Sequence, residues 1–190
     1  MQETKAIDSL QIYATKGFQT RLRRTTEWLG GVNYKNLELV LGKIKDFLSE
    51  DPNEEIHLLV SSYGGATGIG MSFYDAMKWL GANLVTIGSG DVDSSGILIF
   101  LSGKKRYLTQ NTTLLLHLAG RTFEEEKRFS TAEMDSMLKE DKIKDYQYAC
   151  VVADGTGNKC TPEKILELMS SNTILTAEEA LGMGLAHGIF

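Results

Sequence analysis

The segment Leu84-Val-Thr-Ile-Gly-Ser-Gly-Asp-Val-Asp-Ser-Ser-Gly-Ile-Leu-Ile-Phe-Leu101 contains the pattern that decides the fold. It begins with an apolar run typical of a buried strand, breaks at glycine, and continues in a second apolar run that predicts a buried helix. The apolar run at residues 56–60, the Gly64-Gly65 turn and a helical pattern over residues 69–80 repeat this order. Recurrence of strand, glycine turn and helix predicts an α/β fold with parallel strands and crossover helices.

Further helices and a strand are expected on both sides of this repeat. The apolar spacing over residues 37–48 predicts a helix, with Asn33 or Asn36 as its N-cap. Residues 113–116 form a third apolar run, which predicts a strand that ends at His117.

The last third of the chain contains three helix starts. Ser130-Thr-Ala-Glu133 is a capping-box pattern before a long, charged helix, which we expect to project from the core and to pack against a neighbouring copy. Thr161-Pro162 begins the next helix with proline at its favoured first position. Thr176-Ala-Glu-Glu179 is a second capping box and opens a short terminal helix.

Composition limits the classes of protein that this chain can be. Its 190 residues, 42% hydrophobic and 24% charged, suffice for one core. We expect a polar arm over residues 1–26 and a single domain over residues 27–190. A net charge of -5 argues against nucleic acid as a partner. No apolar stretch is long enough to span a bilayer, so we expect a cytoplasmic protein with no membrane partner.

Two features stand at the carboxyl ends of the expected strands, which is where parallel α/β sheets place their sites. Ser94 lies in a glycine turn before an apolar helix, where backbone N–H groups can stabilise developing negative charge. A plain N-cap would explain the same serine. The turn is not a GxSxG elbow, because Val92 stands two residues before Ser94. His117 ends a neighbouring strand, so the two side chains could come within hydrogen-bond reach as nucleophile and base.

Four ordered blocks connect these residues to a known family. They are Val60-Ser-Ser-Tyr-Gly-Gly65, Ile87-Gly-Ser-Gly-Asp-Val-Asp-Ser-Ser-Gly96, Lys105-Arg-Tyr-Leu-Thr-Gln-Asn-Thr-Thr-Leu-Leu-Leu-His117 and Leu175-Thr-Ala-Glu-Glu-Ala-Leu-Gly-Met-Gly-Leu185. Their order and spacing resemble the Clp protease proteolytic subunit family, from about Leu37 to the end of the chain. The resemblance implies a crotonase-like αβ superhelix whose oligomeric rings stack face to face. The charged helix would be the handle between rings, within a handle segment at about residues 121–155.

The resemblance also implies a serine endopeptidase that hydrolyses peptides or unfolded proteins inside a barrel. Ser94 would be the nucleophile and His117 the general base. The backbone N–H groups of Gly64 and Ser95 would form the oxyanion hole. The substrate would pair with the chain after Gly64, and the implied substrate-binding residues are Gly65, Ala66 and Leu118.

No cofactor or metal is implied for this peptidase. The chain has no GxxxxGK[ST] motif, so ATP would be used by a partner, an AAA+ unfoldase. Cys150 and Cys160 do not form a CxxC pair and have no histidine at ligand spacing, so we expect reduced thiols.

The chain departs from the family pattern at the site itself. Asn172 stands where the family has its triad aspartate, and an amide can orient a histidine but has no charge to stabilise the imidazolium. Asp91 and Asp93 replace small neutral residues beside the nucleophile. They either favour the protonated histidine or repel an oxyanion. Low intrinsic activity, or activity that needs a rearrangement, is therefore expected.

Three alternatives stay open on the sequence. The chain could be a catalytically silent ring subunit, for which Asn172 and the acidic neighbours of Ser94 argue. It could be an acyl-CoA hydratase or isomerase of the same fold, which would use the oxyanion hole with acid–base carboxylates. It could also pair serine with a lysine base, and Lys104 and Lys105 are the nearest lysines.

Overall fold

A computed structural model describes residues 24–123 and 127–190 of the chain. The strands are β1 (Thr25–Leu29), β2 (Ile56–Ser62), β3 (Leu84–Val92), β4 (Lys105–Leu108), β5 (Thr113–Leu116), β6 (Thr173–Thr176) and β7 (Gly188–Ile189). The helices are α3 (Tyr34–Glu50), α4 (Thr67–Leu80), α5 (Gly96–Leu101), α6 (Thr131–Gly155), α7 (Pro162–Ser170) and α8 (Ala177–Met183). Most of the polar arm that we expected over residues 1–26 lies outside the described residues.

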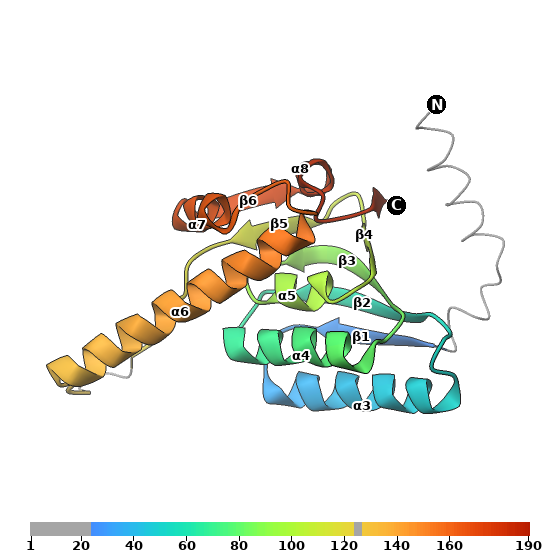
Figure 1. Ribbon diagram of the computed structural model, residues 1–190, viewed down its shortest axis with the longest axis horizontal. Helices are drawn as coiled ribbons and strands as arrows, with labels where there is room; N and C mark the ends of the chain where they lie inside the picture. Colours follow the sequence, from blue (N-terminus) through green and yellow to red (C-terminus); the bar gives the residue numbers. More distant parts are fainter. Residues whose placement is uncertain (1–23, 124–126) are drawn as a thin grey trace.

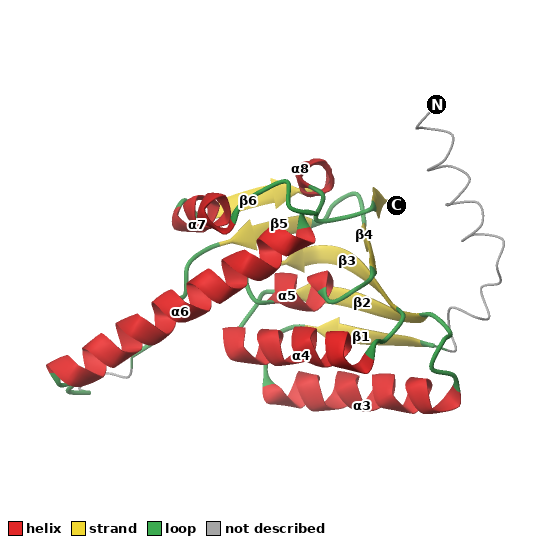
Figure 2. Ribbon diagram, viewed as in Figure 1, coloured by secondary structure: helices red, strands yellow, loops and turns green. Residues whose placement is uncertain are grey.

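The sheet is mostly parallel, in the order β1-β2-β3-β4-β7 (Figure 2). On the edge away from β2, the strand β3 has two different neighbours along its length. Its first half pairs with β4, from Val85 opposite Lys105 to Gly88 opposite Leu108. Its end instead pairs with β5, where Asp91 lies opposite Thr113, and β5 pairs antiparallel with β6. The chain that follows β3 therefore leaves the sheet between β2 and β5.

Helices α3, α4 and α5 lie together along one side of the strands, and α7 and α8 lie beside β6 (Figure 1). Every residue of α5 is buried, which agrees with the apolar run that predicted it. The largest buried side chains include Trp28, Phe73 and Phe100. This mixed α/β architecture with a parallel sheet confirms the expected α/β class, whereas the crotonase-like superhelix and ring formation stay predictions.

The local helix signals are confirmed where the sequence located them. Asn33 caps α3 by accepting a hydrogen bond from the Asn36 N–H at 3.0 Å. Ser130 and Glu133 form the capping box of α6, and Thr176 begins α8 in the same way. Proline opens α7.

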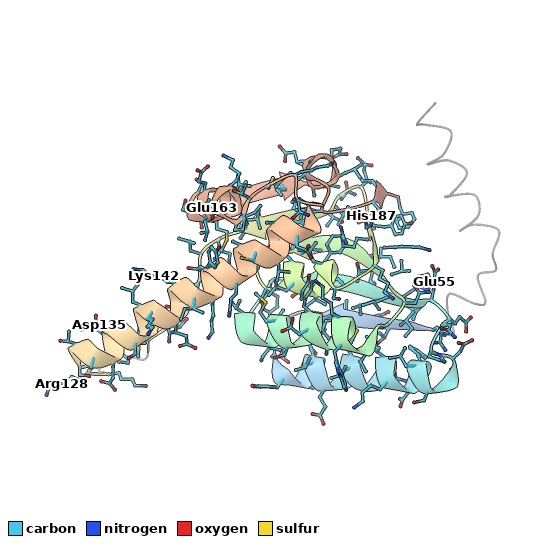
Figure 3. The ribbon with its side chains drawn as sticks, in the orientation of Figure 1. Glu55, Arg128, Asp135, Lys142, Glu163 and His187 are labelled. Atoms are coloured by element: carbon cyan, nitrogen blue, oxygen red, sulfur yellow. The ribbon has the colours of Figure 1, made fainter. Side chains whose placement is uncertain are left out.

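Helix α6 extends well beyond the rest of the molecule, and the labelled side chains of Asp135 and Lys142 lie on its projecting part (Figures 1 and 3). Its buried residues are Tyr148, Ala149, Val152 and Ala153, all in its second half. The projecting helix is thus the charged one that the capping box predicted.

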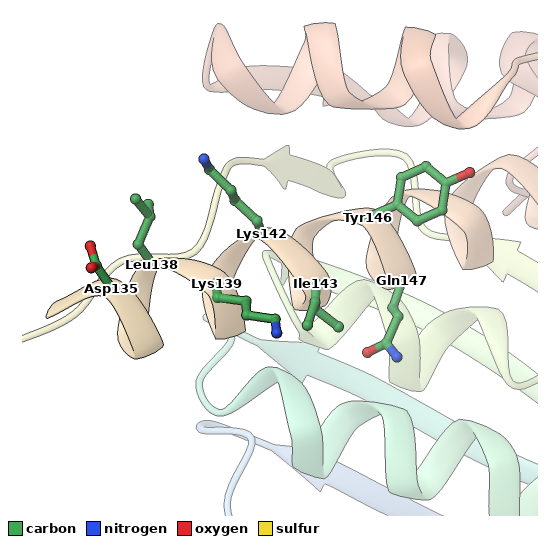
Figure 4. Close-up of a pocket in the computed structure, with 7 residues that line it drawn as sticks. All are labelled: Asp135, Leu138, Lys139, Lys142, Ile143, Tyr146 and Gln147. Carbon is green, nitrogen blue, oxygen red and sulfur yellow. The ribbon is translucent and has the colours of Figure 1, made fainter. Parts of the chain in front are cut away.

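The projecting part of α6 also exposes apolar side chains. Leu138, Ile143 and Tyr146 are each about half exposed and line a shallow groove of about 600 Å³ together with charged neighbours (Figure 4). No element of the described chain covers this face of α6. None of the described helices combines the length and apolar character needed to cross a bilayer.

The start of the domain differs from the expectation. The boundary expected between residues 26 and 27 falls inside β1, which pairs in parallel with β2 from Thr25 opposite His57. Exposed residues of β1 alternate with the buried Thr26 and Trp28, and Trp28 is fully buried. The pattern was missed because only two of its five residues are large and apolar, too few to mark a strand by periodicity.

Arg106 links β4 to the C-terminal helices and gives a test of the fold. Its guanidinium donates hydrogen bonds to the carbonyl oxygens of Leu185 at 2.7 Å and Gly155 at 2.9 Å. We expect Arg106→Ala to lower the free energy of unfolding by about 2–4 kcal/mol, because these partly buried carbonyls lose a charged donor. Urea unfolding checks this, with the exposed Lys43→Ala as the control that should stay close to wild type.

Candidate functional site

Ser94 lies immediately beyond β3 and is held by hydrogen bonds on its main chain. Its N–H donates to the Leu115 oxygen of β5 at 2.8 Å, and its own carbonyl accepts from the Tyr148 hydroxyl of α6 at 3.0 Å. Its φ of 55° lies in the left-handed region, which is uncommon for a residue with a side chain. A strained residue held from two sides is typical of functional sites.

The helix-cap explanation of this turn does not hold. The N-cap of α5 is Ser95, and its side chain makes no capping hydrogen bond. The Ser95 hydroxyl is buried without a hydrogen-bond partner among the described residues. The Asp93 carboxylate accepts from the Leu115 N–H at 2.9 Å instead of capping α5. None of the side chains of residues 93–95 therefore caps the N-terminus of α5.

Gly64 packs directly against Ser94. Its φ is +89°, and a Cβ built on it would lie 2.6 Å from the Ser94 Cβ and 3.1 Å from the Ser94 Oγ. Only glycine fits here, for both reasons. Its N–H donates to the Ser62 hydroxyl at 3.2 Å, so the donor that the resemblance assigns to the oxyanion hole has an acceptor in this structure.

The chain after Gly64 is paired on one side. Val32 donates to the Gly64 oxygen at 2.8 Å and accepts from the Ala66 N–H at 3.0 Å. In such a parallel bridge the N–H and C=O of the middle residue, Gly65, point to the opposite side. The N–H of Ala66 is already bonded to Val32, whereas the N–H and C=O of Gly65 face away from Val32.

His117 directly follows β5. Its Nδ1 lies 2.6 Å from the Leu118 carbonyl oxygen. A carbonyl only accepts, so Nδ1 carries the proton of this hydrogen bond, and in the neutral ring Nε2 then has the free lone pair. That is the tautomer a general base needs.

One cavity of about 680 Å³ brings Ser94 and His117 together, with Gly65 and Ala66 in the same lining. The other three expected site residues of this region, Gly64, Ser95 and Leu118, are not among the lining residues. The sequence had located both principal side chains at strand ends, and they do share one surface.

The other wall of the cavity was not foreseen. Arg121 donates to the Asp141 carboxylate at 2.7 Å and to Glu140 at 2.7 Å, and all three line the cavity with Lys144. Hydrogen bonds from Lys144 and Arg121 lower the pKa of Glu140 to about 2. The spacing of Glu140 and Lys144 could have indicated their ion pair, but nothing in the sequence indicates that Arg121 joins them.

Asn172 has the register position expected of a partner for His117. Thr173 lies opposite Leu116 in the antiparallel pair, so the next residues along are Asn172 and His117. However, Asn172 is exposed with a φ of 48°, and the ring hydrogen bond of His117 is to Leu118. Asn172 thus lies beside His117 in register, but no hydrogen bond joins it to the ring among the described residues.

The buried Tyr148 and the half-buried Asp93, both close to Ser94, have shifted pKa values. Burial raises the pKa of the Tyr148 hydroxyl, and the negative charge of Asp93 raises it further. Burial also raises the pKa of Asp93, against the lowering effects of its hydrogen bond from Leu115 and of His117. Within residues 24–123 and 127–190, no group of three His, Cys, Asp or Glu side chains could hold a metal ion.

The comparisons with known proteins agree with this geometry. The family model for Clp protease matches residues 23–190, which is nearly the whole described chain. The chain belongs to the Clp protease family. The match begins one residue before the described part of the chain and includes Ser94, His117 and α6.

Three curated relatives have related names. ATP-dependent Clp protease proteolytic subunit 2 of Tropheryma whipplei (strain Twist) is 33% identical over 174 residues, which covers 88% of this chain and 91% of the relative. The subunit 2 of Cutibacterium acnes is 31% identical over 180 residues, covering 91% and 80%. The subunit 1 of Leifsonia xyli is 35% identical over 103 residues, about half of each chain (53% and 52%).

The serine–lysine alternative loses its support. Lys104 donates to the Gly81 oxygen, and Lys105 pairs with Glu55. Lys105 begins β4 opposite Val85, near the start of β3, whereas Ser94 lies beyond the end of β3. In Figure 3 Glu55 lies at the end of the molecule away from the projecting part of α6.

The contact between Gly64 and Ser94 predicts a large effect from one methyl group. We expect Gly64→Ala to lower the free energy of unfolding by about 1–3 kcal/mol, because both the backbone conformation and the space exclude a Cβ. The matched control is Gly42→Ala in α3, where the added Cβ meets nothing within 4 Å. That change should stabilise by about 0.5–1 kcal/mol, and urea unfolding of both variants makes the comparison.

Proposed function

We propose that the protein is a serine endopeptidase that hydrolyses peptide bonds through an acyl-enzyme on Ser94, with His117 as its general base. The observation that supports this most is the shared cavity: Ser94 and His117 line one hollow, and His117 has the tautomer that leaves Nε2 free. Membership of the Clp protease family supports the same chemistry.

In the proposed reaction, His117 Nε2 takes the Ser94 hydroxyl proton while Oγ attacks the peptide carbonyl carbon. The oxyanion accepts hydrogen bonds from the Ser95 and Gly64 N–H groups, and for Gly64 this requires exchange of the Ser62 hydroxyl for the substrate. The imidazolium then protonates the leaving amine. Water, deprotonated by the same ring, hydrolyses the ester and releases Ser94.

The substrate would be an extended peptide. Gly65 supports this, because its N–H and C=O face away from Val32 and can pair with an added strand. Backbone pairing recognises any sequence, which suits unfolded proteins as substrates. The relatives' names describe ATP-dependent proteases, so we further propose that an AAA+ unfoldase delivers the substrate. Cytoplasmic localisation stays a prediction.

A fluorophosphonate probe tests the nucleophile. Wild type should form a covalent adduct on Ser94, located by peptide mass spectrometry, and Ser94→Ala should form none. His117→Ala should label at least about 10³-fold more slowly, because the base is lost. Ser72→Ala, an exposed serine in α4, serves as the control and should label like wild type. Absence of labelling in wild type would contradict the proposal.

In this proposal Asn172 contributes less to the reaction rate than the aspartate of a catalytic triad does. Since the Leu118 carbonyl orients the ring, Asn172→Ala should slow labelling by less than about tenfold, far less than His117→Ala. A loss as large as that of His117→Ala would mean that Asn172 is a full member of a triad. The labelling rate at several probe concentrations separates these outcomes.

A second candidate is a weakly active or silent ring subunit. The Gly64 N–H bonded to Ser62 and the exposed, neutral Asn172 favour it. It predicts a folded assembly in which neither wild type nor Asn172→Asp reacts with the probe.

We propose further that the protein forms homo-oligomeric rings that stack through α6. Support comes from the exposed apolar side chains on the projecting part of this helix, which the described chain leaves uncovered. Leu138→Glu should reduce the mass of the assembly in sedimentation velocity, because a charge would have to be buried. Lys35→Glu on α3 is the matched control, and a monomeric wild type would contradict the assembly.

A further inference from the structure

Asp93 occupies an unusual position for a charged residue. It is half-buried directly before Ser94, and its main-chain N–H donates to the Ser62 oxygen of β2 at 2.8 Å. Its carboxylate accepts from the Leu115 N–H of β5 at 2.9 Å. Two residues after Leu115 comes His117. A carboxylate is thus built into the junction of the chain ends after β2, β3 and β5, which contribute one side of the cavity.

This carboxylate is stabilised by few partners. Its Oδ1 has one main-chain donor, and no other hydrogen bond to the carboxylate occurs among the described residues. Burial raises the pKa of Asp93, and the charge of Asp91 adds to this. The opposing effects are the Leu115 hydrogen bond and an attraction to His117. Burial of a charge without full compensation is costly, so a plain structural role would be served as well by a neutral acceptor.

The other ionisable groups around His117 are already engaged. From α6, Asp145 accepts from the Ala119 N–H at 2.8 Å, and Glu140 and Asp141 pair with Arg121. Also from α6, Lys144 pairs with Glu140, and the Tyr148 hydroxyl donates to the Ser94 oxygen. The neutral Asn172 lies at the neighbouring register position on the β6 side. Asp93 and Asp145 each accept from one main-chain N–H and join none of these ion pairs. Of the two, Asp93 directly precedes Ser94, and the charge of His117 lowers its pKa.

We propose that Asp93 supplies the negative charge that stabilises the His117 imidazolium during acyl transfer, in place of the triad aspartate that Asn172 replaces. This deepens the proposed peptidase function and depends on it. The work is divided between two groups: the Leu118 carbonyl holds the ring in its tautomer, and Asp93 provides the charge. In this scheme Asp93 is a positioning and electrostatic residue that touches neither substrate nor the reacting atoms.

A simpler role for Asp93 predicts a different mutational pattern. If the carboxylate only anchored β5 through Leu115, an amide oxygen would serve equally, and Asp93→Asn would behave like wild type. If its charge matters, Asp93→Asn should lower the plateau rate of fluorophosphonate labelling about tenfold. Asp93→Ala should lose both the anchor and the charge and be slower still.

The pH profile gives a readout that an anchoring role would not move. Labelling requires neutral His117, and a nearby carboxylate favours the protonated ring. Asp93→Asn should therefore move the acidic limb of the rate profile to lower pH. The control is Asp91→Asn, which removes an exposed carboxylate near the end of β3, and its profile should stay close to that of wild type because solvent screens the charge.

Titration of the histidine ring by NMR separates this proposal from the proposed function. The His117 ring signal is assigned by its loss in His117→Ala, with His57 and His187 as internal references for the fold. Its titration midpoint should move to lower pH in Asp93→Asn and stay in place in Asp91→Asn. If wild type does not label, the proposed peptidase function is wrong. The change in the His117 midpoint would still measure the interaction between Asp93 and the ring. An unmoved midpoint in Asp93→Asn would overturn the proposal whether or not the protein labels.

Discussion

The pair of main-chain hydrogen bonds at the end of β3 is the constraint on which the site depends. The Asp93 N–H reaches the Ser62 oxygen of β2, and the Ser94 N–H reaches the Leu115 oxygen of β5, both at 2.8 Å. The first continues the pairing of β3 with β2, and the second is possible because β3 changes its other partner from β4 to β5 along its length. A strand that kept one partner would carry Ser94 away from His117. The change of partner aims the turn at the end of β5, where His117 begins.

The same junction explains why small and strained residues gather there. Ser94 adopts a left-handed backbone, and Gly64 approaches it so closely that a Cβ has no space. Each feature costs free energy in the folded state, and the surrounding strands and the Tyr148 hydroxyl hold both in place. Strain that is held from several sides keeps a side chain in one orientation, which acyl transfer needs. The half-buried Asp93 belongs to the same class of costly features.

Helix α6 connects the site with the surface that we propose for assembly. Its second half is buried against the core and contributes Tyr148, while Glu140, Asp141 and Lys144 line the cavity beside Ser94. Its first half exposes apolar side chains to solvent. Contacts made by another copy on the projecting part could therefore bear on Arg121 and its carboxylate partners, which are part of the cavity wall.

The sequence by itself predicted most of the helices, three of the strands and two candidate site residues. Apolar runs that end in glycine predicted β2, β3 and α5, and capping signals located the starts of α6 and α8, because these depend on neighbouring residues alone. It also indicated that Ser94 and His117 stand at strand ends. Only the tertiary structure decided that β3 changes partner, that Leu118 holds the ring, that Val32 pairs beside Gly65 and that Arg121 closes the cavity wall. These contacts join residues far apart in the chain, and a local pattern contains no information about which distant group will supply a hydrogen bond or a charge.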